Sequence, residues 1–205
     1  MRDAFDTLAG EVRHEGGPIK GSRFVATAAP APAVAAAEEV VARVRAELAG
    51  ATHHCWAYRI GPGGESFRAN DDGEPGGSAG RPILAQIEGH GFTDTVVVVT
   101  RWFGGTKLGV GGLMRAYGGA AGRALDRAPR RTVLVTRRLL VVHPYDCSGP
   151  VRGLLAAEGL VPAAADYGAE VRLVLDVPVR SLAAFTAALR DRSAGRAAIR
   201  DAEDP

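Results

Sequence analysis

A glycine-rich, basic run between residues 101 and 117 is the part of the sequence best suited to chemistry. It reads Arg-Trp-Phe-Gly-Gly-Thr-Lys-Leu-Gly-Val-Gly-Gly-Leu-Met-Arg-Ala-Tyr. Glycines let a phosphate or another backbone approach closely, and Arg101, Lys107 and Arg115 add positive charge. The run lacks the Gly-Lys-Ser/Thr ending of a P-loop and the spacing of a dinucleotide fingerprint. It predicts either a site for an anion such as an RNA phosphate, or a helix packed tightly on a sheet through Gly118, Gly119 and Gly122.

A second candidate is the acidic segment from Asp71 to Gly80, which reads Asp-Asp-Gly-Glu-Pro-Gly-Gly-Ser-Ala-Gly. Its carboxylates, Asp71, Asp72 and Glu74, lie close together, and carboxylate oxygens are ligands for divalent cations. Ser78 and the glycines before it suit a backbone nest for an anion instead. Because the carboxylate spacing does not match an EF-hand, we favour a rigid structural turn.

The third candidate is the run His53-His54-Cys55. Histidine and cysteine are ligands of zinc, but neighbours on a strand face opposite sides, so only His53 and Cys55 can share a site. Two ligands are too few, and we predict no metal and no cofactor. We expect a histidine held by a carboxylate of the acidic segment. A Ser–His–Asp triad built on Ser78 is disfavoured.

Regular elements must position these segments. The unbroken β-branched run Thr95–Thr100 predicts a strand buried on both faces, followed by a loop over Arg101–Gly109. A strand over His53–Ile60 and its return over Glu65–Ala69 predict a hairpin across a glycine-rich turn. Extended segments are expected at 11–15 and 19–28. Apolar spacing predicts helices at 33–49, 81–89 and 111–126. Pro129, Arg130 and Arg131 mark a linker.

The C-terminal part has a different order of expected strands and helices. It predicts strands at 133–142, 161–166, 170–177 and 196–200, with helices at 146–158 and 181–192. This βαββαβ order is typical of a ferredoxin-like fold. We therefore expect an α+β protein of two domains, 1–132 and 133–205.

Composition places the chain among ordinary globular proteins. It has 205 residues, of which 46% are hydrophobic and 23% charged. No apolar run approaches the roughly 20 residues that span a bilayer, and the charged N-terminus does not resemble a secretion signal. The two cysteines, Cys55 and Cys147, lie in different expected domains, which favours a reduced, cytoplasmic setting.

Positive charge is concentrated in the middle of the chain. Residues 101–138 hold nine basic side chains and one acidic one, while the whole chain carries a formal net charge of +2. Such asymmetry indicates an anionic partner. A solvated helix face is the alternative explanation.

Taken together, four segments resemble the YigZ/IMPACT family. They are Lys20–Phe24, His53–Arg59, Asp71–Gly80 with Pro82, and Val97–Arg101 continued by Phe103–Tyr117. They occur in the family's order. Gly76 stands where the family usually has Ser, Ser78 where it has Thr, and Trp102 where Tyr is common. The first difference removes a hydroxyl from the acidic segment.

The resemblance implies an N-terminal domain with the left-handed βαβ fold of a ribosomal small-subunit protein and of domain IV of elongation factor G. It implies a C-terminal domain like domain V of that factor. Eukaryotic relatives regulate translation by competing for the activator of a stress kinase. For bacterial members the resemblance implies association with nucleic acid or the ribosome.

Our leading hypothesis is therefore a non-enzymatic, translation-linked regulatory protein that binds RNA or the ribosome. Its basic, glycine-rich surface would use aromatic rings to stack on bases and cations to contact phosphates. The aromatic candidates are Trp102, Phe103 and Tyr117. The cationic candidates are Arg101, Lys107 and Arg115.

Two alternatives stay open. One is a small-molecule or peptide enzyme that uses a cleft between the acidic segment and the glycine-rich run. Asp72 and Glu74 would then act as acid and base or bind a metal, with His53 and His54 nearby. The other is an adaptor for a protein partner in translation control. Neither involves a membrane.

Overall fold

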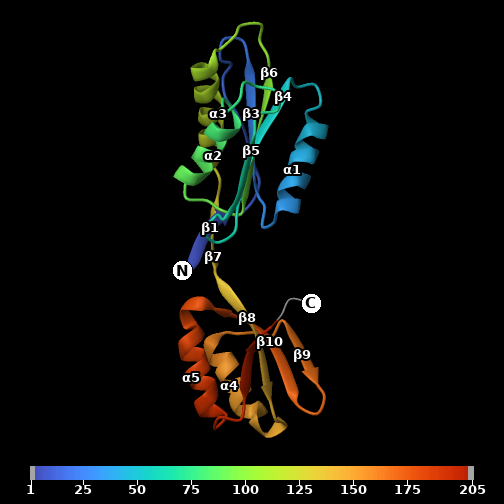
Figure 1. Cartoon of the computed structure of the whole chain (residues 1–205), viewed down its shortest axis with the longest axis vertical. Coiled ribbons are helices and arrows are strands. Elements are labelled where there is room, and N and C mark those ends of the chain that lie inside the picture. Colours follow the sequence, from blue (N-terminus) through green and yellow to red (C-terminus); the bar gives the residue numbers. More distant parts are fainter. Residues whose placement is uncertain (1–2, 203–205) are drawn as a thin grey trace. The chain divides into compact units, whose positions relative to one another are not determined.

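The computed structural model describes residues 3–202, which divide into two compact units between Val133 and Leu134. Each unit has its own sheet and core (Figure 1). The sequence-based boundary was expected one residue earlier, after residue 132. Within residues 3–202, no helix is long and apolar enough to cross a bilayer.

The N-terminal unit is built on an antiparallel five-stranded sheet with the order β2-β3-β6-β4-β5. Its strands are β1 (Ala4–Leu8), β2 (Val12–Glu15), β3 (Arg23–Pro30), β4 (His53–Ile60), β5 (Ser66–Asn70), β6 (Thr95–Trp102) and β7 (Arg130–Leu134). Its helices are α1 (Val34–Glu47), α2 (Gly80–Gly89) and α3 (Val110–Leu125). The predicted helices and the predicted hairpin are confirmed within one or two residues at most boundaries.

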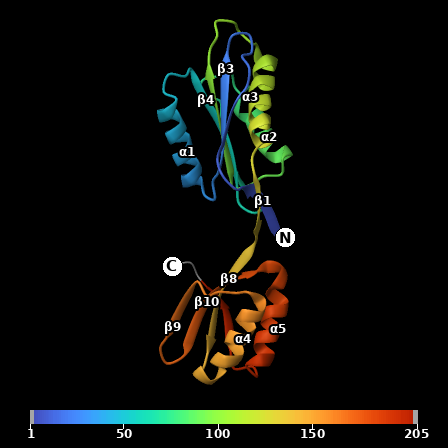
Figure 2. The same ribbon diagram turned by 180° about the vertical axis from the view of Figure 1, so that it is seen from behind.

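Helices cover both faces of this sheet. Helix α1 lies on one face, and α2 and α3 lie on the other (Figures 1 and 2). The central strand β6 explains the unbroken valine run: Val97 and Val99 pack toward α2 and α3, while Val96 and Val98 pack toward α1. A strand covered on both sides has no solvent face for polar residues.

Helix α1 connects β3 to β4, and β6 lies between these two strands in the sheet. Both β3 and β4 pair antiparallel with β6, so they run parallel to each other. This is a βαβ unit, as the family resemblance implied, with β6 inserted between its two parallel strands. Its left-handedness stays a prediction.

Two expectations about chain connections are wrong. The segment expected as a linker forms strand β7, which pairs with β1 in a two-stranded sheet. Arg130 Nη1 and the Thr132 hydroxyl both donate to the Asp6 carboxylate at 2.7 Å, so distant partners order this segment. In addition, β6 continues through Arg101 and Trp102, where a loop was expected, because these residues pair with β3.

The C-terminal unit confirms the ferredoxin-like order. Strands β8 (Thr136–His143), β9 (Ala164–Tyr167), β10 (Val171–Pro178) and β11 (Ala198–Asp201) alternate with α4 (Ser148–Glu158) and α5 (Leu182–Arg192) as βαββαβ. The antiparallel sheet has the order β11-β8-β10-β9. Short 3-10 turns, Tyr145–Cys147 and Val179–Ser181, precede the two helices.

Glycines of α3 pack against a helix rather than against the sheet. A Cβ at Gly118 would lie 3.6 Å from Pro82 of α2, and one at Gly122 would lie 2.7 Å from the Gln86 side chain. Gly119 instead faces the Arg123 guanidinium of its own helix. The expectation of helix-on-sheet contacts through these glycines is therefore wrong.

The closest backbone approach joins the loop before β3 to the loop after β6. A Cβ on Gly104 would lie 1.9 Å from the carbonyl carbon of Gly21 and 2.3 Å from the Ser22 nitrogen. Gly21 itself has a φ of +80°, which side-chain-bearing residues rarely adopt. The two glycines therefore bring two of the sequence motifs together.

We predict that Gly104→Ala lowers the free energy of unfolding by about 1–3 kcal/mol, because backbone atoms must move to admit the methyl group. Urea unfolding measures the change. Gly111→Ala is the matched control, since its Cβ would meet only the flexible Arg115 side chain at 3.6 Å. Equal stability of the two variants would contradict the close contact.

Candidate functional site

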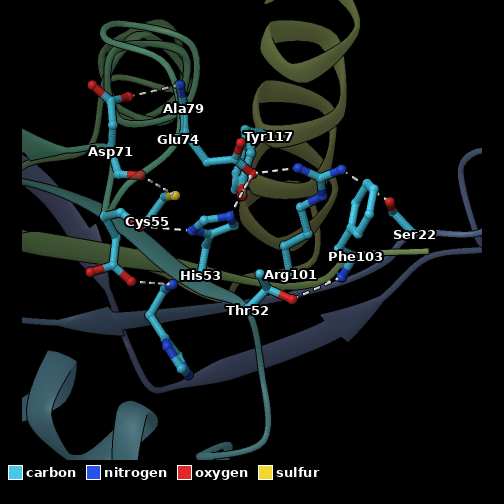
Figure 3. A network of polar contacts seen from close by, with 12 residues as sticks. Ser22, Thr52, His53, Cys55, Asp71, Glu74, Ala79, Arg101, Phe103 and Tyr117 are labelled. Atoms are coloured by element: carbon cyan, nitrogen blue, oxygen red, sulfur yellow. Dashed lines mark hydrogen bonds and ion pairs between the residues drawn. The ribbon is translucent and has the colours of Figure 1, made fainter. Parts of the chain in front are cut away.

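A buried carboxylate, Glu74, lies at the centre of a polar network between the acidic loop, β6 and α3 (Figure 3). Its Oε1 accepts hydrogen bonds from Arg101 Nη1 and from the Tyr117 hydroxyl, each at 2.6 Å. The Glu74 and Arg101 side chains are each only 5% exposed. The pairing connects three elements that are far apart in the sequence.

Arg101 is held from several sides. Its Nη2 donates to the Ser22 hydroxyl at 3.1 Å, and its guanidinium lies 5.6 Å from the ring centre of Phe24 and 5.4 Å from that of Phe103. The expectation of a solvent-facing phosphate contact at Arg101 is wrong, because the continuation of β6 carries this side chain into the interior. Its buried Nε has no hydrogen-bond partner among the described residues.

The three aromatic candidates have different environments. Tyr117 is fully buried, and burial raises the pKa of its hydroxyl, so the expected stacking on a base is wrong for this ring. The Arg23 guanidinium lies over the Trp102 ring, with its central carbon 4.4 Å from the ring centre. Phe103 is 47% exposed, and it alone of the three keeps a largely open ring.

Asp71 shows why the acidic loop is rigid. Its carboxylate accepts backbone N–H bonds from Gly77, Ala79 and Gly80 at 2.8–2.9 Å, which satisfies donors at the start of α2. Burial alone would raise the pKa of Asp71, but these three bonds outweigh it and hold the pKa below its ordinary value. The contacts support the interpretation of this segment as a structural turn.

Asp72 links the acidic loop to strand β4, which carries His53 and His54. Its φ is +44°, and its carboxylate pairs with Arg45 and accepts the His54 backbone N–H at 2.6 Å. His53 Nδ1 lies 2.8 Å from the Asp72 main-chain oxygen, so its short hydrogen bond is not to a carboxylate, although the Glu74 carboxylate of the acidic segment does lie near its other ring nitrogen. Because a carbonyl only accepts, Nδ1 carries the proton, and Nε2 is left 3.8 Å from Glu74 Oε1.

The other nucleophile and ligand candidates are occupied or buried. His54 lies on the opposite strand face, where burial lowers its pKa and its Nε2 is 3.2 Å from the Leu48 oxygen. Burial raises the pKa of the Cys55 thiol to about 12. Among the residues described, no group of three or more His, Cys, Asp or Glu side chains is arranged to hold a metal ion.

Ser78 has the spacing of a nucleophile elbow without its geometry. Residues 76–80 read Gly-Gly-Ser-Ala-Gly, which matches Gly-x-Ser-x-Gly, a match that the sequence-based prediction of a structural turn did not take into account. The Ser78 hydroxyl is fully buried and has no hydrogen-bond partner in the described part of the chain. It therefore forms no hydrogen bond with either histidine.

A cavity of about 320 Å³ lies where the acidic loop and the glycine-rich loop meet, and we call it the Glu74 cavity. Its polar lining consists of His53, Glu74, Arg101 and Lys107. The rest of its lining consists of Pro75, Phe103, Leu108, Gly109, Val110 and Leu113. The structure thus brings several of the predicted site residues around one space.

A second, smaller space lies beside α3, and we call it the basic hollow. It has a volume of about 180 Å³ and is lined by Ile19, Lys20, Leu108, Gly112, Arg115, Ala116 and Arg123. Lys20 and Arg123 were not among the residues predicted for a site. Lys20 was only part of a recognised motif, and Arg123 only part of a charge count, so nothing in the sequence placed them beside Arg115.

Comparisons with known proteins match both units. A model of the Impact N-terminal domain covers residues 20–125, and one of a domain of unknown function, DUF1949, covers residues 141–196. An IMPACT family member in the pol 5' region of Thermus thermophilus is 47% identical over 78% of this chain and 86% of its own length. The IMPACT family member YigZ of Escherichia coli is 38% identical over 86% of this chain and 88% of its own. A crystal structure of a hypothetical protein has a TM-score of 0.77 at 33% identity, with all of both chains covered.

We predict that Glu74→Gln lowers the free energy of unfolding by about 3 kcal/mol, because it leaves the Arg101 charge buried without an anionic partner. Tyr117→Phe removes a neutral donor and should cost about 1 kcal/mol. Denaturant unfolding of both variants measures the difference. Glu38→Gln, at an exposed position of α1, is the control. A cost for Glu74→Gln no larger than the control's would contradict the network.

Asp71→Asn should lower the free energy of unfolding by about 1–3 kcal/mol at neutral pH, since an amide is a weaker acceptor for three backbone donors. The folded-state pKa lies below the ordinary value of 3.8, so the carboxylate stabilises the fold above that pH. This stabilisation is lost as the pH falls through the folded-state pKa. The gap between parent and variant should therefore narrow below about pH 5.

Urea unfolding at a series of pH values between neutral and acid measures that gap. Glu88→Gln removes an exposed carboxylate of α2 and should give a gap near zero throughout. If the difference in free energy of unfolding between the parent and Asp71→Asn increased toward acid pH, the stabilising role of the ionised Asp71 carboxylate would be contradicted.

Proposed function

The chain belongs to the IMPACT family, and on that premise we propose that it is a non-enzymatic regulatory protein that binds RNA through the outer surface of α3. Membership of this family supports a general translation-associated regulatory role. RNA binding is the specific activity that we propose within that role, on the ribosome or on free RNA in the cytoplasm.

One observation carries the proposal: the basic hollow gathers Lys20, Arg115 and Arg123 around one space. All three side chains are exposed, and none forms an ion pair with a carboxylate among the described residues. Cations without acidic neighbours create a local positive potential that attracts phosphate groups.

Four of the other seven basic side chains in residues 101–138 are paired with carboxylates. The paired arginines are Arg101 with Glu74, Arg130 with Asp6, Arg137 with Asp201 and Arg138 with Asp176. The unpaired positive charge of residues 101–138 is therefore carried by fewer residues than the sequence indicates. Much of what remains lies on the α3 surface, with Lys107 in the loop just before it.

The surroundings of the hollow fit a phosphate backbone. Gly111 and Gly112 carry no side chain close to Arg115 on α3, which allows a phosphate backbone to approach the helix there.

We predict that a variant with Arg115→Ala and Arg123→Ala binds single-stranded RNA more weakly and with less salt dependence. Each lost phosphate contact should reduce the slope of log affinity against log salt by about 0.7 for a single strand. Fluorescence anisotropy titrations at several salt concentrations measure both quantities.

The matched control carries Arg152→Ala and Arg172→Ala, two exposed arginines of the C-terminal unit, and has the same net charge. Parent-like affinity and slope are expected for it. Equal losses in the two double variants would show a mere effect of net charge. Absence of RNA binding by the parent at about 50 mM salt would refute the proposal.

A further inference from the structure

We propose that the Glu74 cavity holds one unstacked base of the bound RNA and selects bases that carry an amino group. This inference rests on the proposed RNA binding, because the basic hollow would supply the phosphate contacts that bring the strand to the cavity. It assigns to the cavity a specific ligand, a nucleobase, and a preference for adenine, cytosine or guanine over uracil.

The cavity and the basic hollow are neighbours. Leu108 lines both, and Arg115 lies on α3 a few residues beyond Val110, which lines the cavity. The exposed Lys107 lines the cavity and has no ion-pair partner among the described residues. A strand whose phosphates follow Arg115 and Lys107 therefore passes the cavity, and one of its bases can turn inward.

The size and apolar walls suit a planar ring. A volume of about 320 Å³ is at the lower end of the range for small-ligand sites. Phe103 is 47% exposed and Val110 is 54% exposed, so an aromatic and an aliphatic side chain face solvent beside the cavity. Aromatic side chains bind unpaired bases by stacking.

The position of Phe103 is fixed by its backbone. Its N–H donates to the Thr52 hydroxyl at 3.0 Å (Figure 3). The neighbouring Gly104 N–H donates to the Ser22 hydroxyl at 3.2 Å. The Arg101 guanidinium lies 5.4 Å from the centre of the Phe103 ring. The ring is therefore held beside the cavity before any ligand arrives, which lowers the entropic cost of stacking.

Two acceptors in the polar lining call for N–H donors on the ligand. His53 carries its proton on Nδ1, which leaves a lone pair on Nε2 in the neutral ring. Glu74 uses Oε1 for both Arg101 and Tyr117, and its Oε2 has no partner within the described residues. A base with an amino group supplies the two N–H donors that these atoms lack.

The amino group separates uracil from the other bases. Adenine, cytosine and guanine each carry an exocyclic amino group, whereas the exocyclic atoms of uracil are two carbonyl oxygens, so uracil cannot supply both N–H donors from one group. The unpaired Nε–H of Arg101 is shielded from solvent in the described part of the chain and is therefore not a donor that a base in the cavity reaches.

The test compares the binding of the RNA hexamers rA6, rC6 and rU6 by the full chain, measured by fluorescence anisotropy. We expect rA6 and rC6 to bind at least fivefold more tightly than rU6. Phe103→Ala should weaken rA6 by about fivefold or more, and Phe103→Tyr, which keeps a ring, should not. His53→Phe should reduce the preference for rA6 over rU6 while the salt slope is retained. Denaturant unfolding of each variant identifies any that is not folded.

The outcomes separate this inference from the proposed function. Equal binding of the three hexamers, with weakening by Arg115→Ala and Arg123→Ala, would overturn the base site and leave RNA binding intact. No binding of any hexamer would overturn both. A titration with adenosine monophosphate alone distinguishes a free nucleotide from a strand: saturable binding of the mononucleotide without binding of rA6 would refute the RNA assignment.

Discussion

The N-terminal unit depends on one buried ionic interaction, the contact of the Glu74 carboxylate with Arg101 and Tyr117. A charge pair removed from water loses hydration, and its mutual contact together with further hydrogen bonds must offset that loss. Here Glu74 comes from the acidic loop, Arg101 from the central strand β6, and Tyr117 from α3. Maintaining this contact places the acidic loop and the glycine-rich loop around one cavity.

The same constraint divides the glycine-rich run into an inner and an outer part. Arg101 and Tyr117 are directed inward, and the tight approach of Gly104 to Gly21 fixes the loop between them. Arg115 and Arg123 remain outside with Lys20, around the basic hollow. A sequence that looks uniformly basic thus provides a buried framework and, next to it, a cationic surface.

Periodic features could be predicted from the sequence, and features set by long-range partners could not. The valine run of β6 and the βαββαβ order follow from local patterns and are confirmed. The pairing of β7 with β1 depends on Asp6, which lies more than a hundred residues from Arg130. Tyr117 lies on the same face of α3 as Leu113, Ala120 and Ala124, a periodic pattern from which its burial could have been predicted. The contact of His53 with a main-chain oxygen carries no sequence signal.

The most direct test that the outer part of the glycine-rich run binds RNA is an NMR titration of the full, isotope-labelled chain with single-stranded RNA. The account predicts shift changes in the backbone amides of residues 19–22, 103–115 and 123, with the amides of β8, β9, β10 and β11 unchanged. Signals of Glu74 should also change, because its Oε2 accepts from the base, whereas those of Tyr117 should change only through its neighbours, since its hydroxyl stays in the buried network. Shift changes confined to the C-terminal unit, or none at all, would contradict the claim that the outer face of this run binds RNA.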